Sequence, residues 1–220
     1  MNDFDKIIKF FSKQRMEFYV KNFGNNNESV IEAYECNVLL SSQLYIYLQY
    51  FEVIFRNFCN EEIIRIYKDE QWYSNRKILL DNTDKFVEKQ INSAKDRIKK
   101  PNNVQQTCFK NCDIISNMDL GFWVYIFAGI NENKIWQPCF RDTFNKHNLK
   151  RNRIWHTLDD IRFIRNKIAH HGCIIKYDYE KYYNNISSIL NCIAPSIMDR
   201  LEHISNFKTI DNQLQLLKQI

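Results

Sequence analysis

Four side chains able to act on a phosphate group lie within one short segment of the chain. Arg165, Asn166, His170 and His171 are separated by no more than six positions. An imidazole can move protons near neutral pH, and a guanidinium offers a fixed fork of donors to a phosphate whose charge changes during reaction. An RNA 2′-hydroxyl that attacks its own phosphodiester needs a base, an acid and a cation. These residue types therefore predict chemistry on an RNA phosphodiester.

The apolar residues around this segment predict the element that positions it. From Trp155 to His171 the spacing favours one helix, whose core-facing stripe consists of Leu158, Ile161, Ile164 and Ile168. Gly172 suits the C-cap of this helix, which would place both histidines in its last turn.

The polar residues of this helix lie at two different angles from its apolar stripe. Arg162, Asn166 and His170 follow one another at intervals of four and form a ridge away from the core. Arg165 lies about 40° from the centre of the apolar stripe, so its guanidinium should be half-buried and need an acidic partner. A structural alternative exists, because imidazolium near a helix C-terminus complements the helix dipole and Arg with Asn can simply pair.

The segment Arg165–His170 resembles the R-x4-H form of the HEPN signature, with the polar residue after Arg that HEPN ribonucleases prefer. The wider pattern is similar to the Abi-like family of bacterial phage-defence proteins, of the AbiD/AbiF type, over roughly residues 10 to 195. Three blocks carry this resemblance: Tyr34–Glu35–Cys36–Asn37 with Glu52–Val53–Ile54–Phe55–Arg56–Asn57, Leu120–Gly121–Phe122–Trp123 with Trp136 after it, and Ile161–His171.

The resemblance implies an all-α HEPN fold in which the motif helix packs against the helix that carries the Glu52 block. It implies a homodimer in which two motifs face one composite cleft, and RNA cleavage without metal that leaves a 2′,3′-cyclic phosphate. It also implies association with a structured non-coding RNA. One departure is that the family usually continues His-His-Glu-Pro-Ile, whereas Gly172–Cys173–Ile174 follows His171 here, which puts the role of His171 in more doubt than those of Arg165 and His170.

Roles follow for the residues of the motif. His170 would act as general base or acid, Arg165 would stabilise the developing charge, and Asn166 would position the phosphate or hold the imidazole. Arg162 would contact an adjacent phosphate.

A second polar group, on the helix that carries the Glu52 block, would support this motif. Glu52 is the expected partner of Arg165, and Arg56 and Asn57 would extend the same polar cluster. An ordinary Glu52–Arg56 ion pair within one helix is the alternative.

The composition predicts a helical bundle. Only four Gly and three Pro interrupt 220 residues, of which 45% are apolar. We expect a single all-α domain over residues 1–220, a HEPN-type bundle with additional helices. Its expected parts are an N-terminal helix over about 3–21, a core over about 28–192 and C-terminal helices over about 193–220. Within the core we expect helices near 28–67, 83–99, 120–127, 136–144, 155–171 and 179–192, a loop around Trp72, and a connection over 100–112.

The net charge of +5 leans towards an anionic partner, and two basic clusters would attract a phosphate backbone. A solvated surface is the alternative for each cluster. The first cluster contains Lys95, Arg97, Lys99, Lys100 and Lys110, and the second contains Lys146, Lys150, Arg151 and Arg153. The aromatic run Phe122–Trp123–Tyr125–Phe127 is expected to be core and not a base-stacking platform.

The seven cysteines are scattered and odd in number, which favours free thiols in a cytoplasmic protein. Cys108 and Cys112 lack a second pair at zinc-site spacing, so we expect no metal site and no cofactor. The start of the chain lacks the pattern of a secretory signal, and no uninterrupted apolar segment reaches membrane-spanning length.

Three functions remain from the sequence. The first is a metal-independent endoribonuclease of phage defence. The second is a non-catalytic RNA-binding subunit that holds a structured RNA. The third is a helical scaffold without a nucleic-acid role.

Overall fold

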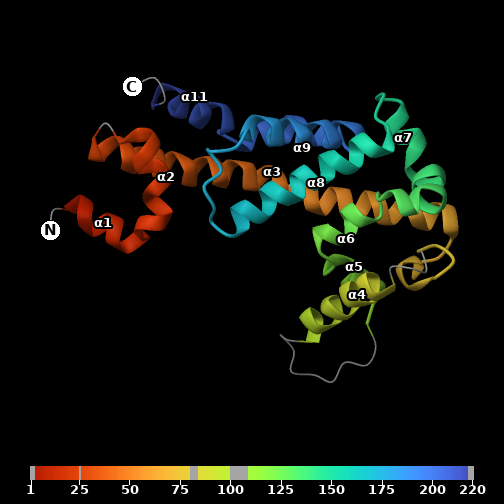
Figure 1. Cartoon of the computed structure of the whole chain (residues 1–220). Helices are drawn as coiled ribbons and strands as arrows, with labels where there is room; N and C mark the ends of the chain where they lie inside the picture. The colour runs from red at the N-terminus through yellow and green to blue at the C-terminus, as the bar shows by residue number, and fades with distance from the viewer. Residues whose placement is uncertain (1–2, 25, 80–83, 100–108, 218–220) are drawn as a thin grey trace.

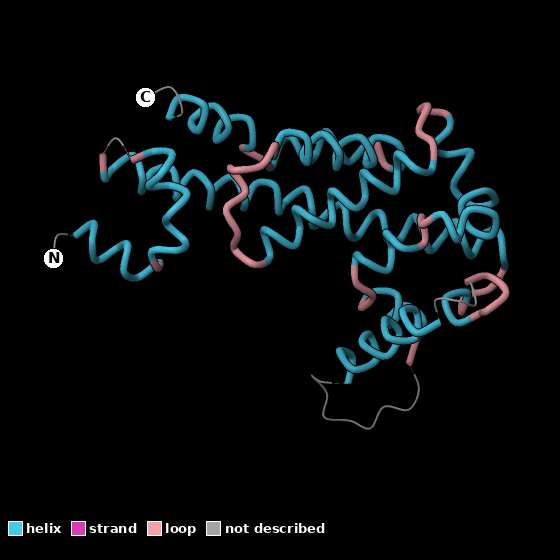
Figure 2. Tube along the Cα trace, in the orientation of Figure 1, coloured by secondary structure: helices cyan, strands magenta, loops and turns pink. Residues whose placement is uncertain are grey.

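One long helix, α3 (Asn27–Tyr67), organises the fold and runs along most of the molecule (Figure 1). The computed structural model describes residues 3–24, 26–79, 84–99 and 109–217, and within these ranges it contains eleven α-helices and no strand (Figure 2). The predicted all-α class is therefore confirmed.

The other helices are, in chain order, α1 (Asp3–Phe11), α2 (Lys13–Phe23), η1 (Trp72–Ser74), α4 (Asp84–Lys99), α5 (Asn111–Ser116), α6 (Leu120–Tyr125), η3 (Gly129–Asn131), the π-helical η4 (Glu132–Phe140), α7 (Arg141–Asn145), α8 (Arg151–Ala169), α9 (Tyr179–Ile193), α10 (Ser196–Ile204) and α11 (Phe207–Leu217).

Local signals fix both ends of α3. The Asn26 side chain accepts a hydrogen bond from the backbone N–H of Ser29 at 2.8 Å and so caps the first turn. At the other end Lys68 adopts a left-handed conformation, and its N–H donates to the Ile64 carbonyl. The predicted helix over 28–67 is confirmed to within one residue.

The core lies where the preceding helix and three helices distant in sequence pack on α3. α2, α8, α9 and α11 all contact it, and Figure 1 shows α8 and α9 lying along its length. The α3 side chains at this contact recur at helical spacing and are fully buried, among them Leu40, Leu44, Leu48, Phe51 and Phe55. By length and composition α3 also passes the test for a membrane-spanning helix, which core helices of soluble proteins pass as well.

The N-terminal helix expected over 3–21 is instead two helices. Ser12 separates α1 from α2 with a φ of 72°, and its hydroxyl accepts from the Arg15 backbone N–H at 3.3 Å. Phe11 and Tyr19, one from each helix, both pack on Tyr34 of α3, with ring centroids 4.6 and 5.4 Å from the Tyr34 ring. Because one straight helix could not present both rings to the same partner, this tertiary contact overrides the continuous apolar pattern.

The segment between α4 and α8 also departs from the prediction. The expected connection over 100–112 ends in an unexpected helix, since α5 already begins at Asn111, while residues 100–108 lie outside the described part. The helix expected near 136–144 is a π-helix from Glu132 that contains Pro138, followed by α7. The ring of Phe140, at the end of this π-helix, stacks on the ring of Phe127, with 4.7 Å between the ring centroids. The predicted aromatic core is confirmed for Phe122, Trp123 and Phe127, which are at most 2% exposed, whereas Tyr125 is only partly buried.

Candidate functional site: the α8 motif and an arginine-lined pocket

α8 carries the motif and is held by its apolar stripe. Leu158, Ile161 and Ile164 are fully buried and Ile168 is 8% exposed, as the spacing predicted. The helix begins at Arg151, four residues earlier than expected, and it contacts α3, α6 and α9. Burial of this stripe on three neighbouring elements fixes which face of α8 remains for function.

The predicted ridge lies on the solvent side of α8. Arg162, Asn166 and His170 are all exposed. The guanidinium of Arg162 is already engaged, because its Nε donates to Asp159 Oδ1 at 3.0 Å. This is an exposed pair three residues apart, worth only a few tenths of a kcal/mol, so a phosphate can replace it at little cost.

Arg165 has the predicted position and the predicted partner. Its Nε donates to Glu52 Oε1 at 2.9 Å, which joins α8 to α3, and the two side chains are 34% and 28% exposed. Its Nη1 also donates to the Asn166 amide oxygen at 3.3 Å. The hydrogen bond to Glu52 raises the pKa of the Arg165 guanidinium. The ion pair fixes the direction of the guanidinium beside the ridge.

The end of α8 differs from the prediction that Gly172 caps it with both histidines in the last turn. The helix ends at Ala169, His170 is the C-cap, and His171 takes the left-handed conformation with a φ of 54°. The N–H of His171 donates to Ile168 O at 2.9 Å and that of Gly172 to Lys167 O at 2.7 Å. This is a Schellman motif in which histidine occupies the position that glycine usually takes.

Two contacts hold the chain that follows the motif. The buried side chain of Asn37 accepts from the backbone N–H of Ile174 at 2.7 Å and of Ile175 at 3.4 Å. From α2, the Arg15 guanidinium donates to the His171 carbonyl oxygen. α2 and α3 thus fix the backbone exit of the motif helix.

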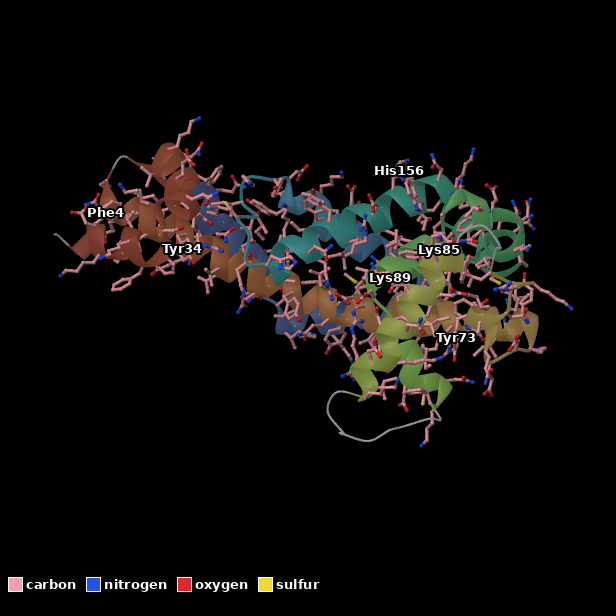
Figure 3. All side chains as sticks on the ribbon, turned by 60° about the horizontal axis from the view of Figure 1, so that its bottom comes forward. Phe4, Tyr34, Tyr73, Lys85, Lys89 and His156 are labelled. Carbon is pink, nitrogen blue, oxygen red and sulfur yellow. The ribbon has the colours of Figure 1, made fainter. Side chains whose placement is uncertain are left out.

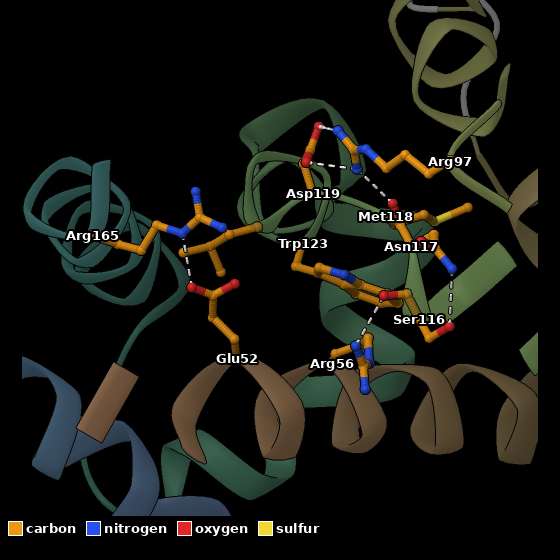
Figure 4. A pocket seen from close by; sticks show the side chains of 10 residues that line it. Glu52, Arg56, Arg97, Ser116, Asn117, Met118, Asp119, Trp123 and Arg165 are labelled. Carbon is orange, nitrogen blue, oxygen red and sulfur yellow. Dashed lines mark hydrogen bonds and ion pairs between the residues drawn. The ribbon is translucent and has the colours of Figure 1, made fainter. Parts of the chain in front are cut away.

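A pocket of about 200 Å³ opens on the Glu52 side of Arg165 (Figure 4). α3 contributes Glu52 and Arg56 to it, and α8 contributes Arg165. Arg97 of α4 enters from the other side, where its Nη1 lies 2.9 Å from Asp119 Oδ1 and also donates to the Asn117 carbonyl oxygen at 2.7 Å. Figure 4 shows the Trp123 ring between these groups. The remaining lining residues are Ser116, Asn117, Met118 and Leu120.

Arg56 is hydrogen bonded to neutral acceptors at the pocket and not to Glu52. Its Nη1 donates to the Ser116 carbonyl oxygen at 3.2 Å and its Nε to the Asn57 amide oxygen at 3.4 Å. Glu52 pairs with Arg165, and no ion pair within 4 Å joins Glu52 to Arg56, so the alternative of a pair within α3 is wrong. Burial lowers the pKa of the Arg56 guanidinium, and the charge of Glu52 opposes this shift.

The two histidines do not line this pocket. His171 instead faces a second, larger pocket of about 640 Å³ that also contains Tyr34, Val38 and Tyr45 of α3. The His170 imidazole is exposed and makes no hydrogen bond within the described part of the chain. A substrate would therefore have to contact the ridge from the solvent side and reach Arg165 at the edge of the ridge.

The residues of the first basic cluster have different surroundings in the structure. Arg97 belongs to the arginine-lined pocket, and the ammonium groups of Lys95 and Lys99 lie 5.9 and 5.7 Å from the centroid of the Phe109 ring. Lys110 is exposed, and Lys100 lies outside the described residues. Its described members therefore do not form one uniform surface.

The residues of the second basic cluster have different surroundings as well. Lys150 and Arg153 are exposed at the start of α8, and Lys146 is exposed at the end of α7. Arg151 is only 17% exposed, because its Nε donates to Glu132 at 2.9 Å and its Nη1 to the Phe127 carbonyl oxygen at 3.0 Å. Its guanidinium is engaged within the fold instead of facing solvent.

Several members of the site were not predicted from the sequence, among them Asp119, Trp123 and Asn37. Asp119 and Trp123 line the pocket, and Asn37 holds the chain after the motif. Asn37 carried a weak signal, because an amide stands there in an otherwise apolar helical pattern. For Asp119 no local signal existed. Within the described ranges, no group of three or more His, Cys, Asp or Glu side chains has an arrangement able to hold a metal ion, and Cys108 lies outside those ranges.

Comparison with known proteins adds no relative: no family model matches the chain, and neither a curated protein nor a solved structure matches it. The candidate site therefore rests on the geometry of its own residues.

Proposed function

We propose that this protein acts on RNA as a metal-independent endoribonuclease of the HEPN type, with a role in phage defence. The observation that carries the proposal is the arrangement on α8. An exposed ridge of Arg162, Asn166 and His170 stands beside Arg165, whose guanidinium Glu52 holds in place. This arrangement offers a proton-transfer group and an oriented cation at one surface.

The proposed step is intramolecular attack by the RNA 2′-hydroxyl on the adjacent phosphorus. The base takes the 2′-hydroxyl proton, the P–O2′ bond forms, the P–O5′ bond breaks, and an acid protonates the departing 5′ oxygen. His170 acts as base or acid, and Arg165 stabilises the charge of the phosphorane-like transition state. Asn166, already hydrogen bonded to Arg165, positions the phosphate.

The proposed partners are RNA and a second copy of the chain. A structured non-coding RNA would control the enzyme, and a homodimer would bring two ridges to one cleft. The protein would work in the cytoplasm without a cofactor. Exposed apolar side chains of α3 next to the end of α8 support the dimer, since Val38 and Tyr45 are 50% and 43% exposed and line the pocket that also contains His171.

One observation favours a second candidate, a non-catalytic subunit that holds a structured RNA. Within the described residues nothing orients the His170 imidazole by a hydrogen bond, and Arg165 faces Glu52 and the arginine-lined pocket. A surface that only binds phosphates needs cations and no oriented imidazole.

The two candidates separate when binding and cleavage are measured on the same variants. The wild type and His170→Ala are purified, the RNA that co-purifies is sequenced, and each protein is incubated with total RNA in EDTA. His156→Ala is the matched control, because His156 is also exposed on α8 but lies towards its other end (Figure 3).

Bound RNA in all three proteins, with cleavage by the wild type and His156→Ala only, is the expected result. Bound RNA without cleavage by any of them favours the binding subunit. Neither binding nor cleavage contradicts both candidates.

A further inference from the structure

The charges around the arginine-lined pocket do not balance. Three guanidinium groups and two carboxylates line it. Glu52 pairs with Arg165 and Asp119 with Arg97, each at 2.9 Å. Arg56 is left with neutral acceptors only, and no carboxylate described by the structure lies within 4 Å of its guanidinium. The pocket therefore carries one surplus positive charge. A half-buried cation without a counter-ion is unfavourable.

Trp123 lines the same pocket, and its buried indole N–H is an unused donor in the pocket wall. Trp123 is 2% exposed, and its indole N–H has no hydrogen-bond partner among the residues that the structure describes. The indole N–H of Trp72, also buried, donates to the Asn60 amide oxygen at 2.9 Å. A buried donor without an acceptor is destabilising. The described part of the chain therefore supplies this donor and no acceptor for it.

A surplus cation and an unpartnered donor call for an anion that offers several acceptor oxygens. A phosphate group meets both needs, because a guanidinium binds two of its oxygens side by side and a third remains for an N–H. The volume of about 200 Å³ also suits it, since a water molecule takes about 30 Å³ of liquid and a phosphate group is only a few times larger. The carboxylates of Glu52 and Asp119 do not repel it strongly, because each is neutralised by its own arginine.

We propose that this pocket is a phosphate-binding subsite, in which Arg56 and the Trp123 indole N–H contact the phosphate while Arg97 and Arg165 neutralise the two carboxylates that line it. Arg165 stands between the subsite and the ridge of α8. In an RNA complex, the subsite would hold a phosphate near the one that reacts. Only this assignment to RNA rests on the proposed function, since a free phosphate or a nucleotide offers the same chemistry.

The indole N–H signals of the four tryptophans in a ¹⁵N-correlated NMR spectrum report on the subsite directly. Inorganic phosphate is titrated into the full-length protein, and Trp123→Phe identifies the Trp123 signal by its loss. The expected result is a saturable shift of the Trp123 signal, because its N–H gains an acceptor. The Trp72 signal should stay in place, because its N–H is already bonded to Asn60.

Two arginine variants on α3 form a matched pair for this titration. Arg56→Gln should weaken phosphate binding about tenfold or more, the effect of losing one charge-assisted hydrogen bond. Arg65→Gln should bind as the wild type does, because Arg65 is exposed and pairs with Glu62 outside the pocket. Arg56→Lys keeps the charge without the fork and should lie between them, and it replaces Arg56→Gln if that variant does not fold.

The proposal is overturned if phosphate up to tens of millimolar leaves the Trp123 signal unchanged, or if Arg56→Gln and Arg65→Gln bind equally. Two short RNAs of one sequence, with a 5′-phosphate or a 5′-hydroxyl, identify the source of the group. Tighter binding of the 5′-phosphate form indicates a terminal phosphate, and equal binding indicates a backbone phosphate. Phosphate binding by a protein that cuts no RNA would refute the proposed function alone, and cleavage without phosphate binding would refute the subsite alone.

Discussion

Glu52 and Arg165 are 113 residues apart in the chain and form the one ion pair that joins the motif helix to α3 within the described residues. We expect Glu52→Gln to lower the free energy of unfolding by about 1–2 kcal/mol, between the values for exposed and buried pairs, because both side chains are about two-thirds buried. It should also slow RNA cleavage, because the guanidinium loses its orientation. Chemical unfolding and a cleavage assay measure the two effects.

Glu62→Gln is the control for this pair. Glu62 lies on the same helix and pairs with Arg65 three residues away, with the arginine side chain 58% exposed. Its loss should cost less than about 0.5 kcal/mol. Equal effects of the two substitutions would show that the Glu52–Arg165 pair does not organise the site.

Asn37 holds the backbone after the motif. Asn37→Leu should destabilise the protein by about 2–3 kcal/mol, because it leaves the buried N–H groups of Ile174 and Ile175 without their acceptor. Gln49→Leu makes the same change of type on α3 at an exposed position and should stay within about 0.5 kcal/mol. Urea unfolding compares them, and a loss below 1 kcal/mol for Asn37→Leu would mean that these bonds contribute little.

The end of α8 is an element whose stability can be increased. His171 adopts a φ of 54°, which glycine adopts without steric cost. His171→Gly should raise the free energy of unfolding by about 0.5–1 kcal/mol. Ala169→Gly, at the last helical residue, should lower it by a similar amount. A lower melting temperature for His171→Gly would contradict the assigned helix end.

Elements with a regular apolar period could be predicted from the sequence, and those bent by distant contacts could not. α3 and the stripe of α8 follow a period that local residues determine. The break at Ser12 depends on Tyr34, which is more than twenty residues away. The end of α8 was predicted two residues too late, at His171 instead of Ala169, because Gly172 is the usual residue for a left-handed cap and His171 takes that conformation instead.

At the scale of the whole molecule, the exposed apolar face of α3 predicts self-association. Val38, Tyr45 and Val53 are 50%, 43% and 47% exposed and lie within about 80° of one another around the helix. We expect a dimer in sedimentation experiments, and Val38→Glu should make it a monomer.

Val20→Glu is the matched control for this experiment. Val20 is 45% exposed but lies on α2, so its substitution should leave the dimer intact. A wild type that sediments as a monomer at all concentrations would contradict the proposed composite cleft.

The site itself could be predicted only in part. The half-burial of Arg165 was predicted from the period of its helix, and its partner Glu52 was predicted with the help of the resemblance. The ion pair between the two side chains is present. The pocket did not follow, because Arg97, Asp119 and Trp123 reach it from α4, the residue before α6, and α6. No local pattern in these segments reports which other helix they face. Such non-local packing is what the sequence periodicity does not encode.

The chemistry of the RNA ends that the purified protein produces in EDTA tests the proposed cleavage directly. We expect 2′,3′-cyclic phosphate and 5′-hydroxyl ends from the wild type and His156→Ala, and no such ends from His170→Ala. Ends that His170→Ala produces at the wild-type rate, or cleavage that appears only when Mg²⁺ is restored, would contradict it.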